Sequence, residues 1–315
     1  MMKRLVVSIL ILVLIILGLR FFMKPALTLF ARKLLERAFQ TSDVHIGNSR
    51  LTFLQQLAFS DIRVKKLESF DIKIKQASIV YSLPSLLNRR VTKFKLEEVT
   101  FGGLALKELE LIRIQIQLAP RKVQVSGDLN IPQIKYQKAK IGPLQAKLKI
   151  DNKVLYLDSL TAQIFNGKAE GRISLNLDKK MDYQADLNFI DLDIDRFIRD
   201  FDLKERFQMT GILEGKVYLT GSGATIQQIK GDLATSQAGG QLTITDKRIL
   251  ENLARTSQQS LDILVESFKN YYYNIGIVKL GMEEGNLVVD VRLNGEGGAR
   301  NLNIVVHDFN LRRRQ

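Results

Sequence analysis

A run of alternating acidic residues is the first candidate for chemistry, because its spacing is that of a calcium-binding loop. Asp191, Asp193 and Asp195 stand at the first, third and fifth positions, and Asp202 stands at the twelfth. A calcium loop needs glycine at its sixth position for a sharp turn, and this chain has Arg196 there. The pattern therefore favours a strand that ends in a helical turn, and we expect no metal site.

Other residues that could do chemistry are few. His45 and His307 are far apart in sequence, and neither lies in a metal-ligand spacing. There is no cysteine, which removes disulfides and thiolate metal sites. Glycine-rich residues 221–225 and 295–300 lack the strand–loop–helix context of a phosphate-binding loop, and no GxSxG motif is present. The sequence thus predicts no enzyme and no cofactor.

The charge balance limits the partners. The chain has 315 residues and a formal net charge of +14, which favours contact with anionic surfaces such as lipid headgroups or nucleic acid. Most lysines and arginines alternate with apolar residues, as in residues 72–75, and so lie on the solvated face of strands. No nucleic-acid-binding motif is visible. We therefore expect phospholipids and a membrane as partners, and no nucleic acid.

The first residues predict a membrane anchor. Leu5–Leu19 carries no charge, and Leu5–Met23 approaches the roughly 20 apolar residues that span a bilayer if Arg20 snorkels. A cleaved signal peptide would need small residues after the apolar run, where this chain has bulky and charged ones. The sequence thus predicts one uncleaved transmembrane helix over residues 1–24.

The orientation of this anchor depends on two opposing signals. Lys3 and Arg4 favour a cytoplasmic N-terminus, but more basic residues follow the span, and the positive-inside rule alone favours the reverse. Long downstream domains are exported largely regardless of flanking charge. We therefore expect a single-pass inner-membrane protein with its bulk in the periplasm.

Residues 25–42 predict an amphipathic helix beside the membrane. One face holds apolar residues, and the other is mostly charged. Two interpretations stay open, because the basic side could lie on headgroups while the helix also caps the β-domain. The apolar positions are Leu27, Phe30, Leu34, Ala38 and Phe39, and the expected membrane-surface residues are Arg32, Lys33 and Arg37.

From about residue 43 the hydrophobic period changes from 3.6 to 2, which indicates strands with one apolar and one polar face. Gly-marked turns separate the strands, and no βα alternation is present. We predict a mainly β fold, an elongated, curled antiparallel sheet with a few short helices, over residues 43–315. Short helices are expected at residues 82–90 and 195–201. One longer helix is expected near residues 246–272, with Asp246 as its N-cap.

Four stretches of the chain resemble the AsmA-like superfamily of bacterial envelope proteins, and the last resembles its YdbH-like members. They are the N-terminal anchor followed by residues 77–101; residues 160–177 with 192–198; residues 211–223 with 229–235 and 239–244; and residues 268–274 with 284–304. The resemblance implies an inner-membrane anchor, a periplasmic sheet curled into a groove, and phospholipid transfer toward the outer membrane. Some members carry a dicarboxylate-transport label, but a single span offers a dicarboxylate no route through the bilayer.

The residues agree with a groove, because a long sheet with one apolar face must bury that face and only short helices are available to cover it. The alternative is a closed sandwich, in which the same face is ordinary core. From alternation alone, the candidate lipid-lining residues are Ile72, Ile74, Ile112, Ile114, Ile116, Ile173, Leu175, Val217, Leu219, Val289 and Val291.

The last strand, residues 300–309, predicts a free sheet edge to which a strand from an envelope partner could add. The resulting hypothesis is an inner-membrane-anchored lipid-transfer or bridge protein without catalysis. The alternative is an envelope biogenesis scaffold that assists the assembly of outer-membrane proteins.

Overall fold

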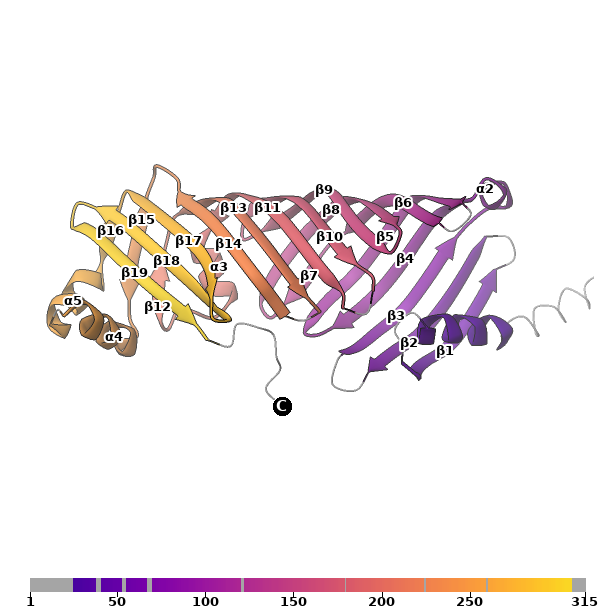
Figure 1. The fold of residues 1–315 in the computed structure, drawn as a ribbon, viewed down its shortest axis with the longest axis horizontal. Coiled ribbons are helices and arrows are strands. Elements are labelled where there is room, and N and C mark those ends of the chain that lie inside the picture. Colours follow the sequence, from indigo (N-terminus) through magenta and orange to yellow (C-terminus); the bar gives the residue numbers. More distant parts are fainter. Residues whose placement is uncertain are drawn as a thin grey trace, which may run out of the picture. The chain divides into compact units, whose positions relative to one another are not determined.

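The computed structural model describes residues 25–37, 41–52, 55–66, 70–119, 122–178, 180–223, 225–258 and 260–307. The chain forms two compact units, residues 1–117 and 118–315. Both are mainly β, and their paired strands are antiparallel, as the alternating sequence predicts (Figure 1). The predicted anchor over residues 1–24 lies outside the described residues, as do residues 38–40 of the predicted helix. Among the helices that are described, none is long and apolar enough to cross a membrane.

The first unit holds a helix over residues 25–37, here called the N-terminal helix, and a run of strands. Each strand pairs antiparallel with the next along the chain. Helix α2 (Leu83–Leu87) joins β3 to β4 where the sequence predicts a short helix. The strands are β1 (Asp43–Thr52), β2 (Gln56–Lys66), β3 (Phe70–Val80), β4 (Arg90–Phe101) and β5 (Leu104–Ala119).

The second unit holds a longer antiparallel sheet in the order β6-β8-β9-β10-β11-β13-β14-β17-β18-β19, with β7 paired to β8. Neighbours in this order are mostly neighbours in the chain, which explains the turn signals between alternating segments. The strands are β6 (Lys122–Ile131), β7 (Ile134–Tyr136), β8 (Ala139–Asp151), β9 (Val154–Ile164), β10 (Gly167–Asn176), β11 (Asp182–Asp193), β13 (Ile212–Ser222), β14 (Thr225–Thr235), β17 (Ile275–Glu283), β18 (Asn286–Gly295) and β19 (Gly298–Val306).

Two excursions of the chain leave this sheet and meet again, and together they are here called the cap. The excursion between β11 and β13 forms α3 (Ile194–Asp200) and β12 (Phe207–Met209). The excursion between β14 and β17 forms β15 (Gly240–Ile244), α4 (Lys247–Ser257), α5 (Leu261–Lys269) and β16 (Tyr271–Tyr273). Strands β12, β15 and β16 pair in a separate three-stranded sheet. The cap therefore depends on pairing between segments that are distant in sequence.

The predicted helix near residues 246–272 is two helices. Asp246 caps α4 as predicted, because its carboxylate accepts a hydrogen bond from the Arg248 amide. Helix α4 ends at Ser257, its C-cap Gln258 has a left-handed backbone, and Ser260 caps α5. The polar residues between the helices interrupt the apolar period, so nothing holds one continuous helix there. The residues beyond α5, Tyr271–Tyr273, form β16.

Candidate functional site

The candidate site is the apolar face of the long sheet in the second unit. Directly opposed residues of an antiparallel pair lie on the same face. Ile173 is opposite Ala185, and Ala185 is opposite Leu219. Leu219 is in turn opposite Ile229 of β14. Ile173 and Leu219, predicted from separate strands, therefore share one face.

The other predicted residues of this unit lie on the same face. Val217 connects through Gly231 and Leu280 to Val289, because each is opposite the next. Val291 is two residues from Val289 on β18. The placement groups six predicted residues on one face: Ile173, Leu175, Val217, Leu219, Val289 and Val291.

A tyrosine adds one polar atom to this face. Tyr183 is opposite both Leu175 and Gly221, and its hydroxyl donates a hydrogen bond to the Thr225 carbonyl oxygen at 3.3 Å. A Cβ at Gly221 would lie 2.3 Å from that hydroxyl, so glycine is needed there. Burial raises the pKa of Tyr183, which keeps the phenol neutral. The face therefore carries no charge at this point.

One apolar cluster on this face is built from the sheet alone. Val217, Ile229 and Leu233 are its buried members. The partly buried residues packed against it are Phe189, Leu213, Leu219, Val278, Leu280, Met282 and Leu287. All of them belong to β11, β13, β14, β17 or β18, and the cluster includes no residue of a described helix or of the strands β6–β10. We call this cluster the open patch, since all of its described members come from one layer of strands and none comes from a described helix.

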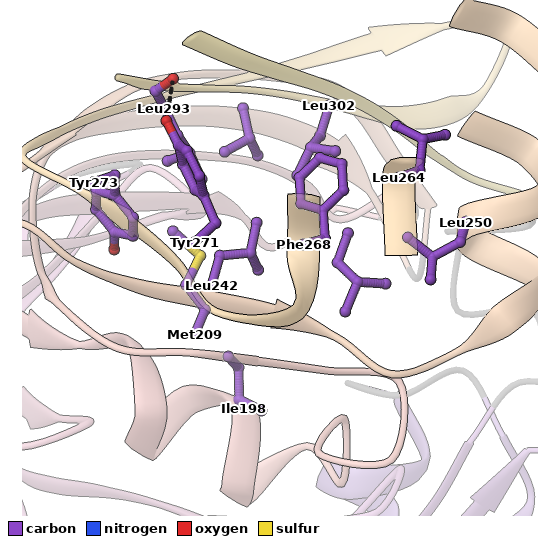
Figure 2. Close-up of a cluster of buried hydrophobic side chains, with 12 residues drawn as sticks. Ile198, Met209, Leu242, Leu250, Leu264, Phe268, Tyr271, Tyr273, Leu293 and Leu302 are labelled. Carbon is purple, nitrogen blue, oxygen red and sulfur yellow. Dashed lines mark hydrogen bonds between the residues drawn. The ribbon is translucent and has the colours of Figure 1, made fainter. Parts of the chain in front are cut away.

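Beyond the open patch, the same face is closed by the cap. Leu293, only 1% exposed, and Leu302 lie in one buried cluster with Phe268 of α5 and with Leu242 of β15 (Figure 2). Two predicted lining residues belong here: Val291 is a buried member of the cluster, and Val289 packs against it. Figure 2 shows side chains of the sheet, α5 and the β15–β16 region converging on one core. These two residues are thus the core of a covered region.

Tyr271 joins the cap to β19 of the sheet, and Tyr273 joins the two excursions of the cap to each other. The Tyr271 hydroxyl donates to the Gly298 carbonyl oxygen, and the Tyr273 hydroxyl donates to the Thr210 carbonyl oxygen, both at 2.5 Å. The Arg300 guanidinium lies 5.2 Å from the Tyr271 ring centroid. Burial raises the pKa of Tyr273 to about 12. Each buried phenol therefore fills apolar space and satisfies its one polar atom.

In the first unit, the predicted residues Ile72 and Ile74 lie beneath the N-terminal helix. Ile74 is opposite Ile62, and Ile72 is opposite Val64. Both pack against a buried cluster that includes Ile62 and Val64, to which Ala31 and Leu35 of the helix also pack. The helix therefore covers this part of the apolar face.

The predicted trio on β5 does not share a face. Ile114 is opposite Val91 and only 5% exposed, whereas Ile112 is opposite Lys93. Lys93 forms an ion pair with Glu110, so Ile112 lies among charged residues. The cause is Arg113, whose left-handed backbone (φ 55°) changes the phase of the alternation.

Because of the phase change at Arg113, Ile112 lies on the charged side of β5. Ile114 and Ile116 lie on its apolar side. Ile116 lies two residues beyond Ile114 and is partly buried. Strict alternation is therefore a poor guide to the faces of β5.

The opposite face of both sheets carries charges paired between strands. In the first unit, hydrogen bonding to Lys93 lowers the pKa of Glu110, and hydrogen bonding to Arg63 lowers the pKa of Asp71. In the second unit, Arg172 pairs with Asp186 at 3.3 Å across β10 and β11. Such cross-strand pairs keep this face in water and define the other face as apolar.

The acidic residues that resembled a calcium-binding loop have structural roles, and no role is assigned to the two histidines. Asp193 accepts a hydrogen bond from the Arg196 amide as the N-cap of α3, and Asp195 forms an ion pair with Arg199. The interpretation as a strand ending in a helical turn is confirmed. Within the described residues, no group of three or more His, Cys, Asp or Glu side chains could hold a metal. His45 lies on β1 and His307 follows β19, so they belong to different units.

The helix residues predicted to face the membrane are placed on two sides. Arg32 forms an ion pair with Glu36 at 2.9 Å. Lys33 and Arg37 are exposed on the same side as Phe30 and Leu34. Phe30 and Leu34, which were predicted to share the apolar face, are exposed, and the membrane-surface role of Arg32, Lys33 and Arg37 stays a prediction.

Sequence reasoning missed most residues of the open patch. Ile229 and Leu233 lie on β14, where polar residues and a register shift opposite Thr220/Gly221 hide the alternation. Leu280 lies on β17, where glycines at 276 and 281 weaken the pattern. The available signal was position, since β14 follows the recognisable strand β13 by one turn and β17 precedes the recognisable strand β18 by one turn.

Taken together, these features define a mainly β protein whose sheet has one charged face and one apolar face. A family model described as the AsmA family matches residues 88–245, and the chain belongs to this family. The AsmA family is associated with the cell envelope and lipid transport. No curated protein and no solved structure matches the chain significantly.

Proposed function

We propose that the protein is a YdbH-like lipid-transfer or bridge protein that shelters phospholipid acyl chains on the apolar face of its second unit. The observation that carries this proposal is the open patch, an apolar cluster made by one layer of strands. Family membership supports a role in lipid transport. The geometry adds the surface on which the lipid would lie.

An apolar face that is partly exposed to water is stabilised when an apolar ligand covers it. Leu219, Leu280 and Leu287 are only partly buried in the patch. Each CH₂ group that leaves water contributes about 0.8 kcal/mol, so an acyl chain would be held without any specific polar contact. Because aliphatic contacts are alike along the face, a bound chain could also slide. Binding and movement then need no catalysis, and we propose no enzymatic step.

The proposed location follows from the first residues of the sequence. An anchor over residues 1–24 would hold the protein in the inner membrane, with its bulk in the periplasm. Lys33 and Arg37 would lie near the anionic headgroups. A periplasmic reporter fused after Gln315 tests the orientation; reporter activity only in the cytoplasm would exclude it.

We also propose that a strand from an envelope partner adds to β19. This strand is at the end of the sheet order, and its neighbour on one side is β18. Ile304, Val305 and Val306 are consecutive and 41%, 42% and 39% exposed. Three consecutive apolar residues suit an edge strand that becomes covered on both faces. Photo-crosslinkers at Asn303 and Val305 should trap a protein in cells; labelling no better than at Leu87 of α2 would contradict the partner.

The main experiment compares two adjacent positions on β13. A photo-crosslinker at Leu219 would lie on the apolar face. One at Tyr218 would lie on the charged face, because the cross-strand neighbour of Tyr218 is Asp186. We expect phospholipid adducts from Leu219 and few from Tyr218. Equal labelling at both positions, or none at Leu219, would overturn the proposal.

The scaffold function gives a different result in the same sample. Native mass spectrometry of the detergent-extracted protein should find bound phospholipid if the open patch holds acyl chains. A lipid-free protein that carries unfolded outer-membrane proteins would favour the scaffold and reject lipid transfer.

A further inference from the structure

The N-terminal helix packs on its sheet with its less apolar side. Ala31 and Leu35 contact the buried cluster of β1–β3. On the same side, the Thr28 hydroxyl donates a hydrogen bond to the Ser49 hydroxyl at 2.9 Å. A helix that only covers a sheet normally places its largest apolar residues inward. Here the inward side has one large apolar residue among these contacts.

The larger apolar residues of this helix face outward. Leu29, Phe30 and Leu34 are 54%, 67% and 53% exposed. At 100° per residue, Leu29 and Phe30 lie on the side away from Ala31 and Leu35, and Leu34 lies at the flank of that side. Burying them on a second surface would remove a large apolar area from water. The helix therefore has two apolar sides, of which its own sheet covers one.

Basic residues share the outward side. Lys33 and Arg37 lie three and seven residues from Phe30, which places them on the same face as Phe30 and Leu34. Among the described residues neither forms an ion pair, whereas Arg32, toward the helix flank, pairs with Glu36. Apolar side chains surrounded by unpaired cations fit a lipid surface, where the cations reach headgroups and the apolar groups reach the acyl boundary.

The position in the sequence identifies the same partner. In the sequence, the described part of the helix comes shortly after residues 5–23, which are apolar except for Arg20. We infer that Leu29, Phe30 and Leu34 insert into the interface of a bilayer that contains anionic phospholipids, with Lys33 and Arg37 on the headgroups. The first unit is then docked on the membrane through this face. This docking does not depend on lipid transfer, and either idea can fail without the other.

The absence of cysteine makes the test direct, because each position can be labelled alone. Full-length F30C, L34C and L87C variants are labelled with a polarity-sensitive fluorophore and reconstituted into vesicles of phosphatidylethanolamine and phosphatidylglycerol. Leu87 of α2 is the matched control, as an apolar residue of the same unit that is 84% exposed. Lipids brominated near the glycerol backbone should quench the labels at 30 and 34 several-fold more than the label at 87. Equal quenching at all three positions would overturn the docking.

A second pair of variants tests the cations. Replacing Lys33 or Arg37 with Gln should lower the ratio of docked to undocked label at residue 30 by about five-fold for each charge in anionic vesicles. The same variants in purely zwitterionic vesicles should change little. The R32Q variant is the control for a helix cation that is already paired. An unchanged ratio in anionic vesicles would reject the role of the cations.

Two other partners could cover the outward face of the N-terminal helix, and each gives a distinct result in these experiments. If a second copy of the chain covers the face, F30C should form disulfide-linked dimers in detergent as efficiently as in vesicles. If residues 5–23 fold back onto it, the label at 30 should be shielded in detergent and unaffected by brominated lipid. Either result would replace the bilayer as the partner.

Discussion

The open patch and the capped end belong to the same sheet, but they differ in what covers them. In the capped end, Leu293 is 1% exposed because α5 and β16 pack over it. In the open patch, Leu219 is partly buried and packs against a cluster whose members all belong to strands of the sheet. Val278 contacts both clusters and so marks the place where the cover ends. The antiparallel strands of the sheet continue from one cluster to the other.

This difference shows that an apolar face becomes core or candidate binding surface according to the cover it receives. The cap reaches the sheet through segments that lie between β11 and β13 and between β14 and β17. The cluster that forms the open patch includes no described residue of these segments. A ligand would therefore stabilise the patch, whereas the cap already stabilises the end.

The largest expected difference is in stability. Leu293→Ala should lower the free energy of unfolding by about 2–5 kcal/mol, because it leaves a cavity in a covered core. Leu219→Ala should cost about 1 kcal/mol, since its side chain is only partly buried. Denaturant unfolding of both lipid-free variants measures the contrast. Equal costs would mean that the patch is covered in solution.

A charge should separate binding from folding. Leu219→Glu should reduce co-purified phospholipid by about ten-fold or more, because an acyl chain would have to desolvate the carboxylate. The fold should persist, since the side chain can reach water. Quantitative lipid analysis and circular dichroism check both parts. Tyr218→Glu on the opposite face is the matched control and should leave lipid unchanged.

Alkaline pH should loosen the cap before the rest of the sheet. The pKa of Tyr273 is raised to about 12 by burial, so the neutral phenol is favoured in the folded state. Its contribution to stability is complete below the unfolded pKa of about 10 and is lost as pH rises from there toward about 12. Hydrogen exchange of β15 and β16 against pH measures this effect. Tyr273→Phe should remove the pH dependence; its persistence would assign it to other groups.

The smallest effect should come from the charged face. Glu110→Gln removes the ion pair with Lys93 and should cost about 0.2–1 kcal/mol at neutral pH, as is usual for partly exposed pairs. The pKa of Glu110 is lowered by Lys93, so its contribution is present above the unfolded value and disappears as pH falls through the folded value. Unfolding at pH 7 and at acidic pH should therefore differ for the native chain more than for the variant.

The sequence predicts the faces correctly where alternation is unbroken and fails where the backbone changes phase. Ile173 and Leu219 share one face, because the register connects them through Ala185. Ile112 does not, since Arg113 adopts a left-handed conformation that no glycine announces. Similar left-handed residues occur in strands at Asp61 and Glu98. A single residue of this kind is decided by its neighbours in the sheet, which alternation does not reveal.

What the sequence determines and what only the tertiary structure decides differ in the range of the interactions involved. Alternation by itself determined that the chain is mainly β and that its strands have an apolar and a charged face, because the pleat is a local property of the backbone. Only the tertiary structure decided that Val291 is core, that Leu219 lies in an open patch, and that Phe30 faces away from its own sheet. Cover comes from segments distant in sequence, and their packing is set by contacts that no local period encodes.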